Sequence, residues 1–156
     1  MKIASYKAFQ SHGRLLDKVI ARLTRGQYSH TEIIFSNGQS FSISPREKKI
    51  RFKEIDFKEE RWNIIELDIT EEDEKKLYNY AVMLEQKTFS YDYTGAIFSI
   101  VPLCIQKANK FFCSELAVKV LNKVEAFWHL NDGCLYTPSK LNNEIEKFMK
   151  EKKRKN

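Results

Sequence analysis

The stretch SHTEIIFSNGQSFSIS, Ser29–Ser44, decides the fold because it has the pattern of a β-hairpin. Apolar and polar side chains alternate on both sides of a central turn, as expected for two strands that each bury one face. The turn, Ser36–Gly38, contains an Asn-Gly pair, and both of these residue types tolerate a positive φ. A three-residue turn sets the register by pairing Phe35 with Gln39.

The rest of the chain predicts further strands and helices around this hairpin. Additional strands are expected over residues 2–9, 49–56 and 62–69. Helices are expected over residues 15–23, 70–86, 94–101, 112–124 and 137–150. The first of these has five apolar residues at helical spacing: Leu15, Leu16, Val19, Ile20 and Leu23. The order is a helix, a four-strand meander and then helices, which indicates an α+β fold rather than alternating βαβ units.

Length and composition favour one domain over residues 1–150, followed by a basic tail, 151–156. The net charge is +6, but residues 147–156 alone carry six basic side chains against one acidic one. The excess is therefore a solvated helix end, or a weak contact of the tail with an anionic surface. No strand interleaves aromatic and basic residues, so a specific nucleic-acid partner is not expected.

The three cysteines, Cys104, Cys113 and Cys134, give an odd count that argues against a disulfide framework. They and His30 lack the spacing of zinc ligands, so neither a metal nor another cofactor is expected. The sequence has no signal-peptide pattern and no apolar run of 18 residues. We therefore expect a cytoplasmic protein.

Cys113 lies at the N-terminus of the expected helix 112–124, which has the clearest apolar periodicity in the chain. Free backbone N–H groups and the helix dipole stabilise a thiolate at that position. The same N–H groups can hold an oxyanion after the thiolate has attacked a carbonyl. Cys113 is thus a candidate nucleophile, and a small core cysteine at a helix start is the alternative.

His30 opens the first hairpin strand and is the candidate base. The turn register pairs Glu32 with Ser42 and His30 with Ser44, so all four residues share one face of the hairpin. Any of the other three could accept a hydrogen bond from the imidazole and orient it. Glu32 lies roughly 6–7 Å from His30 along the strand, which is long for a direct bond.

Three short segments resemble the circularly permuted branch of the NlpC/P60 superfamily, the YiiX/YebB-like papain-like cysteine hydrolases. They are TRGQYSH at residues 24–30, YDYTG at 91–95 and FCSE at 112–115, and a Pro-Ser follows at 138–139. The resemblance spans residues 13–141. It implies a permuted papain-like fold in which a small antiparallel sheet packs against helices that include the cysteine helix.

The resemblance also implies catalysis by Cys113 and His30, with Ser42 at the third position, where many relatives carry a carboxylate or a histidine. We accordingly rank Ser42 first, Ser44 second and Glu32 third as the orienting group. Tyr28 and Tyr91 are expected to line the substrate cleft.

The function expected is a cysteine peptidase, amidase or acyltransferase that cleaves an amide or ester bond of a peptide-like, cell-wall-peptide or lipid-like substrate through a thioester. The alternative is a catalytically degenerate papain-like binding module with a basic tail.

Overall fold

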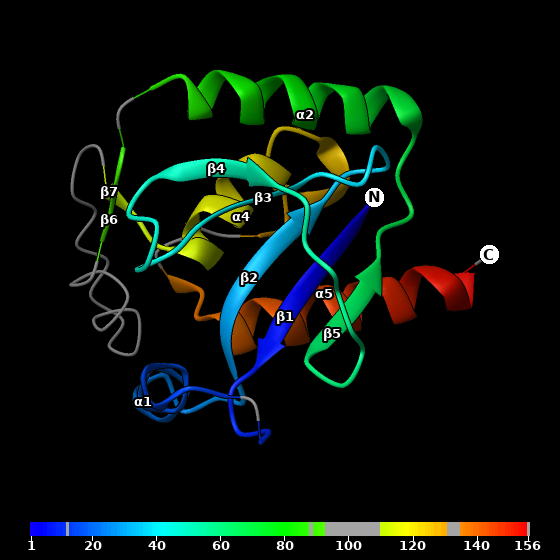
Figure 1. Ribbon diagram of the computed structural model, residues 1–156. Helices are drawn as coiled ribbons and strands as arrows, with labels where there is room; N and C mark the ends of the chain where they lie inside the picture. The colour runs from blue at the N-terminus through cyan, green and yellow to red at the C-terminus, as the bar shows by residue number, and fades with distance from the viewer. Residues whose placement is uncertain (12, 88, 93–109, 131–134, 156) are drawn as a thin grey trace.

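The computed structural model describes residues 1–11, 13–87, 89–92, 110–130 and 135–155, and their arrangement is α+β (Figure 1). A five-stranded antiparallel sheet forms the centre of the fold. Its strands are β1 (Lys2–Lys7), β2 (Tyr28–Ile34), β3 (Ser40–Ile43), β4 (Ile50–Lys53) and β5 (Trp62–Glu66).

The spatial order of the strands is β4-β3-β2-β1-β5. The first four follow one another as a meander, but β5 does not continue it beside β4. Instead β5 pairs with β1 at the opposite edge, where Ile65 lies opposite Ile3. The predicted four-strand meander therefore placed 62–69 at the wrong edge. β5 pairs with the edge of β1 that β2 leaves free, and apolar residues of the two strands lie opposite each other there.

The hairpin of β2 and β3 has the predicted register. Ile33 lies opposite Phe41, and the backbone N–H of Phe35 donates to the carbonyl of Gln39 at 2.9 Å. Gly38 has a φ of +86°, a conformation that costs a glycine little and other residues more. The turn sequence therefore fixes which residues of the two strands face each other.

The described helices are α1 (Leu15–Leu23), α2 (Glu71–Glu85), α4 (Cys113–Leu121) and α5 (Pro138–Lys155), with a 3-10 turn, η1 (Glu125–Phe127). Threonines cap two of them: Thr70 at α2 accepts from the N–H of Asp73, and Thr137 at α5 accepts from that of Lys140, both at 3.1 Å. The α5 helix continues through most of the predicted tail. The helix expected over 94–101 lies outside the described residues.

The core lies between the sheet and the helices. Leu116 on α4 is fully buried, as are Ile33 on β2, Leu77 on α2 and Leu141 on α5. The α4 helix contacts β2, β3, α2 and α5, so it has neighbours on several sides. In Figure 1, α2 crosses the top of the molecule and α1 lies at the bottom, where it contacts β2. None of the described helices is both long and apolar enough to cross a bilayer.

Candidate active site

The segments that carry the family resemblance lie next to one another in space. Ser139 accepts a hydrogen bond from the backbone N–H of Tyr28 at 2.9 Å. Ser139 also packs so closely on Gly26 that a Cβ there would stand 2.1 Å from its Oγ. Gly26 therefore serves a close approach between the start of β2 and α5. This contact unites the first segment with the Pro-Ser that follows the cysteine helix.

A short parallel pair brings the other two segments together. Strands β6 (Ser90–Tyr91) and β7 (Lys110–Phe111) pair directly before α4. The N–H of Asp92 donates to the carbonyl of Phe111 at 2.8 Å. Cys113 is two residues beyond Phe111, so this pairing fixes the entry of the chain into the cysteine helix.

Cys113 is the first residue of α4 and is 3% exposed. The preceding Phe112 is extended, with φ −110° and ψ 167°, so the helix begins abruptly at the cysteine. The N–H groups of a first helical turn have no acceptor within their own helix. The thiol therefore lies beside backbone donors that can stabilise a negative charge on sulfur or on an attacked carbonyl oxygen.

His30 lies between Cys113 and a carboxylate. Its Nε2 is 2.8 Å from Oε1 of Glu32, and its side chain is only 16% exposed. Cys113 acts on the same imidazole, because its charge and a side-chain hydrogen bond both raise the pKa of His30. The structure thus brings together the two residues that the sequence paired as nucleophile and base.

Glu32 is held in turn by a guanidinium. Its carboxylate is 1% exposed and receives two hydrogen bonds from Arg51, at 2.6 and 2.8 Å. Arg51 also donates through Nε to Glu47 at 2.7 Å. This bidentate geometry fixes the plane of the Glu32 carboxylate. A chain of charged contacts therefore runs from Glu47 through Arg51 and Glu32 to His30.

Ser42 is small enough to leave space for this series of charged contacts. In the sheet, Ser42 on β3 lies opposite Arg51 on β4, and the register of β2 and β3 places it opposite Glu32. Arg51 must therefore reach across a strand to meet Glu32, and a side chain as small as serine leaves the path open.

The predicted order of orienting groups is wrong. Ser42 donates its hydroxyl to the backbone carbonyl of Thr31 at 2.6 Å, and Ser44 donates to Glu47 at 3.1 Å. Glu32, ranked third, is the residue in contact with His30. The ranking measured distance along the backbone, whereas the long glutamate side chain reaches back along its own strand to the imidazole.

The protonation of His30 follows from these contacts. Burial lowers the pKa of His30, but the charge and hydrogen bond of Cys113 and those of Glu32 outweigh it and raise the pKa to about 10. Burial raises the pKa of Glu32, but Arg51 and His30 lower it by more. Arg51 and Lys53 likewise lower the pKa of Glu47 to about 2, against its partial burial. Near pH 7 the imidazole is thus protonated beside an ionised carboxylate.

The two tyrosines that are predicted to line the substrate cleft form no hydrogen bond with Cys113, His30 or Glu32 through any atom that the structure describes. Tyr28 is 6% exposed; burial and the charge of Glu146 on α5 raise its pKa. Tyr28 is thus a buried residue whose backbone N–H bonds Ser139 on α5. Tyr91 contributes backbone to β6, and its side chain lies outside the described part of the structure, as do Cys104 and Cys134.

Sequence reasoning missed Arg51, the residue that holds Glu32. A charged side chain between apolar neighbours in a predicted strand was the available signal, because such a residue requires a partner if it is buried. It also missed Trp62, whose ring meets that of His30 edge-on at 6.3 Å and that of Tyr6 at 5.0 Å. These rings form an apolar side to the imidazole.

A buried carboxyl group lies close to the cysteine on α4. Burial is the main cause that raises the pKa of Glu115 to about 7, and the charge of Asp92 adds to it, while the N–H of Phe112 and Lys119 act in the opposite direction.

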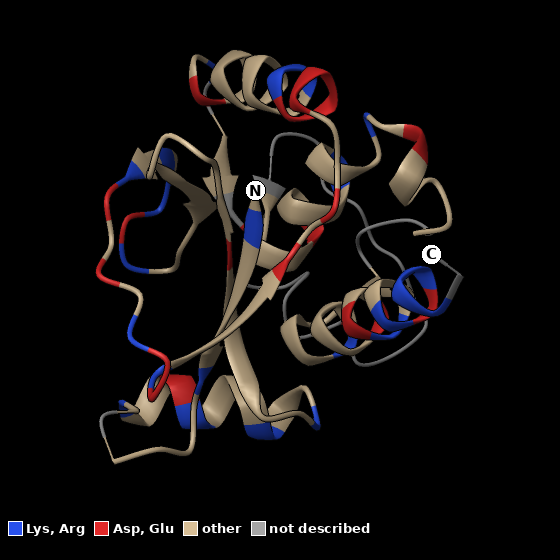
Figure 2. Cartoon of the chain, turned by 90° about the vertical axis from the view of Figure 1, so that its right-hand side faces the viewer, with Lys and Arg blue, Asp and Glu red and all other residues tan. Residues whose placement is uncertain are grey.

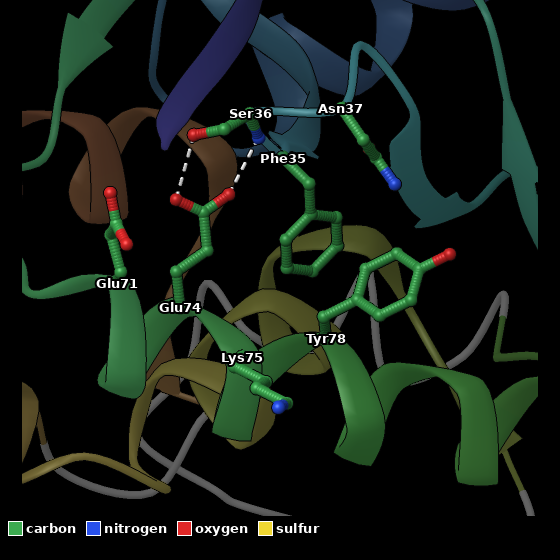
Figure 3. A pocket seen from close by; sticks show the side chains of 7 residues that line it. All are labelled: Phe35, Ser36, Asn37, Glu71, Glu74, Lys75 and Tyr78. Atoms are coloured by element: carbon green, nitrogen blue, oxygen red, sulfur yellow. Dashed lines mark hydrogen bonds between the residues drawn. The ribbon is translucent and has the colours of Figure 1, made fainter.

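Two surface hollows, with volumes of about 310 and 300 Å³, do not include Cys113 or His30. The first lies beyond the far end of β2, between the hairpin turn and α2 (Figure 3). There the carboxylate of Glu74 accepts hydrogen bonds from the backbone N–H and the hydroxyl of Ser36. Glu74 also pairs with the N-terminal ammonium of Met1 at 3.4 Å. These contacts tie the hairpin turn and the chain start to α2.

Comparison with protein-family models, curated proteins and solved structures found no match to this chain. The kinship with the permuted NlpC/P60 branch therefore stays a prediction based on the sequence motifs.

Proposed function

We propose that this protein is a thiol hydrolase or acyltransferase that opens an amide or ester bond through a thioester on Cys113. The observation that carries the proposal is the grouping of three residues: Glu32 hydrogen-bonds His30 at 2.8 Å, and Cys113 at the start of α4 lies near enough to His30 to raise the pKa of the imidazole. A nucleophile, a base and a group that orients the base are the three parts that such chemistry requires. The proposal includes a permuted papain-like arrangement of the sheet and the cysteine helix.

The proposed mechanism begins with the proton of Cys113 already on His30. The sulfur attacks the carbonyl carbon, and a C–S bond forms while the carbonyl oxygen becomes negative. The N–H of Cys113 and its neighbours in the first turn of α4 bind this oxyanion. His30 then gives its proton to the departing amine or alkoxide as the bond to carbon breaks.

The second half restores the enzyme. Water, or another acceptor with a hydroxyl or amino group, loses a proton to His30 and attacks the thioester carbonyl. The acyl group leaves Cys113, whose sulfur is again a thiolate beside a protonated imidazole. Throughout, Glu32 holds the ring in one orientation and stabilises its positive charge, and Arg51 holds Glu32.

Labelling with iodoacetamide at pH 7, followed by mass spectrometry of the peptides, tests the nucleophile. We expect Cys113 to react faster than Cys104 or Cys134, and His30→Gln to slow its reaction at least about tenfold. An excess of p-nitrophenyl acetate should leave an acetyl group on Cys113.

Lys119→Gln supplies the matched control because Lys119 is an exposed side chain on the same helix. It should leave the labelling of Cys113 unchanged. Equal rates at all three cysteines, or an unaltered rate in His30→Gln, would mean that the thiol is not activated and that the chain has another function.

A further inference from the structure

The α1 helix turns its apolar side away from the protein. Leu15, Leu16, Val19 and Leu23 are 43 to 79% exposed. At 100° per residue these four positions share an arc of about 100° on the helix surface. The side chains buried beneath α1 are Asp17 and Ala21, on the opposite side. Phe9, just before the helix, is also 53% exposed.

Basic residues border this exposed arc. Lys18 and Arg22 follow it on the helix surface, and Arg25 lies just beyond the C-terminal end of α1. Within the described part of the chain, none of these three forms an ion pair. At the basic end of α5, by contrast, two side chains are paired: Lys150 with Glu146 at 3.1 Å and Lys152 with Asp68 at 2.7 Å. Figure 2 shows α1 at the lower end of the molecule, with basic positions along it.

We propose that α1 docks the protein onto an anionic lipid surface. A short amphipathic helix with leucines on one side and basic residues beside them fits the boundary between lipid headgroups and acyl chains. A second copy of the chain fits less well, because a symmetric contact through α1 would bring like charges together. Four side chains also cover far less than the roughly 800 Å² that each partner of a stable dimer buries.

Docking through α1 would place the candidate active site near the lipid. The helix packs against β2, the strand that carries His30. Tyr6 lies opposite His30 in the sheet, and after burial the charge of Asp17 on α1 is the next cause that raises the pKa of Tyr6. In this respect the inference rests on the proposed function: among the substrates left open, it selects a lipid-like ester or amide.

Sedimentation with lipid vesicles tests the docking without using the thiol chemistry. The full chain should bind vesicles of phosphatidylcholine with about 30% phosphatidylserine, bind pure phosphatidylcholine much less, and release as salt increases. The double variants Leu16→Ser/Val19→Ser and Lys18→Gln/Arg22→Gln should each lower the partition coefficient about tenfold or more. Cys113→Ala should bind like the unaltered chain, which separates this test from that of the proposed function.

Matched controls come from elsewhere on the surface. Met83→Ser alters an exposed apolar residue on α2, and Lys152→Gln/Lys153→Gln alters the basic end of α5. Both should leave vesicle binding unchanged, and circular dichroism should show that every variant is folded. The proposal is overturned if the anionic vesicles are not bound, if only the α5 variant loses binding, or if Leu16→Ser/Val19→Ser instead dissolves a dimer seen in ultracentrifugation.

Discussion

The α1 and α4 helices are both nine residues long and amphipathic, yet they have opposite relations to the protein. The α4 helix buries eight of its residues, and only Lys119 is exposed. The α1 helix buries two, Asp17 and Ala21, and leaves its leucines in solvent. Apolar spacing alone therefore does not tell whether a helix belongs to the core.

The difference has its origin in the neighbours of each helix. The α4 helix has two strands and two other helices around it, so nearly every direction from its axis meets protein. The α1 helix packs against β2, and its buried carboxylate, Asp17, accepts hydrogen bonds from the N–H of Arg14 and from the guanidinium of Arg46 in the segment between β3 and β4. A polar attachment leaves the apolar side of a helix available for a second surface.

The first prediction compares the same substitution in the two helices. Leu116→Ala should lower the free energy of unfolding by about 2 to 5 kcal/mol, because it removes a fully buried side chain and leaves a cavity. Leu16→Ala, at a position 47% exposed, should change it by less than about 0.5 kcal/mol. Urea denaturation of both variants measures the difference. Similar losses would mean that α1 also belongs to the core.

Much of the fold could be predicted because local rules decide it. The Asn-Gly turn set the register of β2 and β3, and the helices expected from residues 70 and 137 do begin there, at threonine caps. The position of β5 could not be predicted in this way. Whether a strand extends a meander or joins its other edge depends on contacts between residues about 60 positions apart, such as Ile3 and Ile65.

The candidate site could be predicted only in part. The helix start marks Cys113 and the hairpin marks His30, because both depend on local sequence. The choice of Glu32 over Ser42 depends on Arg51, which lies two strands away and meets Glu32 only when β4 pairs with β3. Without that guanidinium a buried glutamate at position 32 would be unfavourable, and a neutral serine would be the safer choice.

The second prediction concerns Glu32 on β2, which belongs to the same buried part of the molecule as α4. Glu32→Gln should lower the rate of acetylation of Cys113 by p-nitrophenyl acetate about 100-fold, because a neutral amide orients the imidazole less well and does not stabilise its charge. The variant also leaves Arg51 without its main partner in the sheet. The single-turnover rate, measured as release of p-nitrophenolate, gives the result.

Ser42→Ala is the matched control on the neighbouring strand. It loses the hydrogen bond to the carbonyl of Thr31, which should cost about 1 kcal/mol of unfolding free energy while the acetylation rate stays within about threefold. If Ser42→Ala were as damaging as Glu32→Gln, the serine would orient the ring and the observed contact of Glu32 would be secondary.

The third prediction concerns the smallest effect, a shift in the titration of His30. Cys113 and Glu32 together outweigh the effect of burial and raise the pKa of His30 to about 10. The ring should therefore keep its proton well above the ordinary histidine pKa of about 6.5 and lose it only as the pH approaches 10. In Glu32→Gln one of the two raising groups is neutral, so the midpoint should move down, by about one pH unit. Titration of the ring carbons by NMR, with labelled histidine, measures both midpoints directly. A midpoint near 6.5 in the unaltered chain would show that His30 does not take the proton of Cys113. The pair of a thiolate and a protonated imidazole, on which the proposed chemistry depends, would then not form.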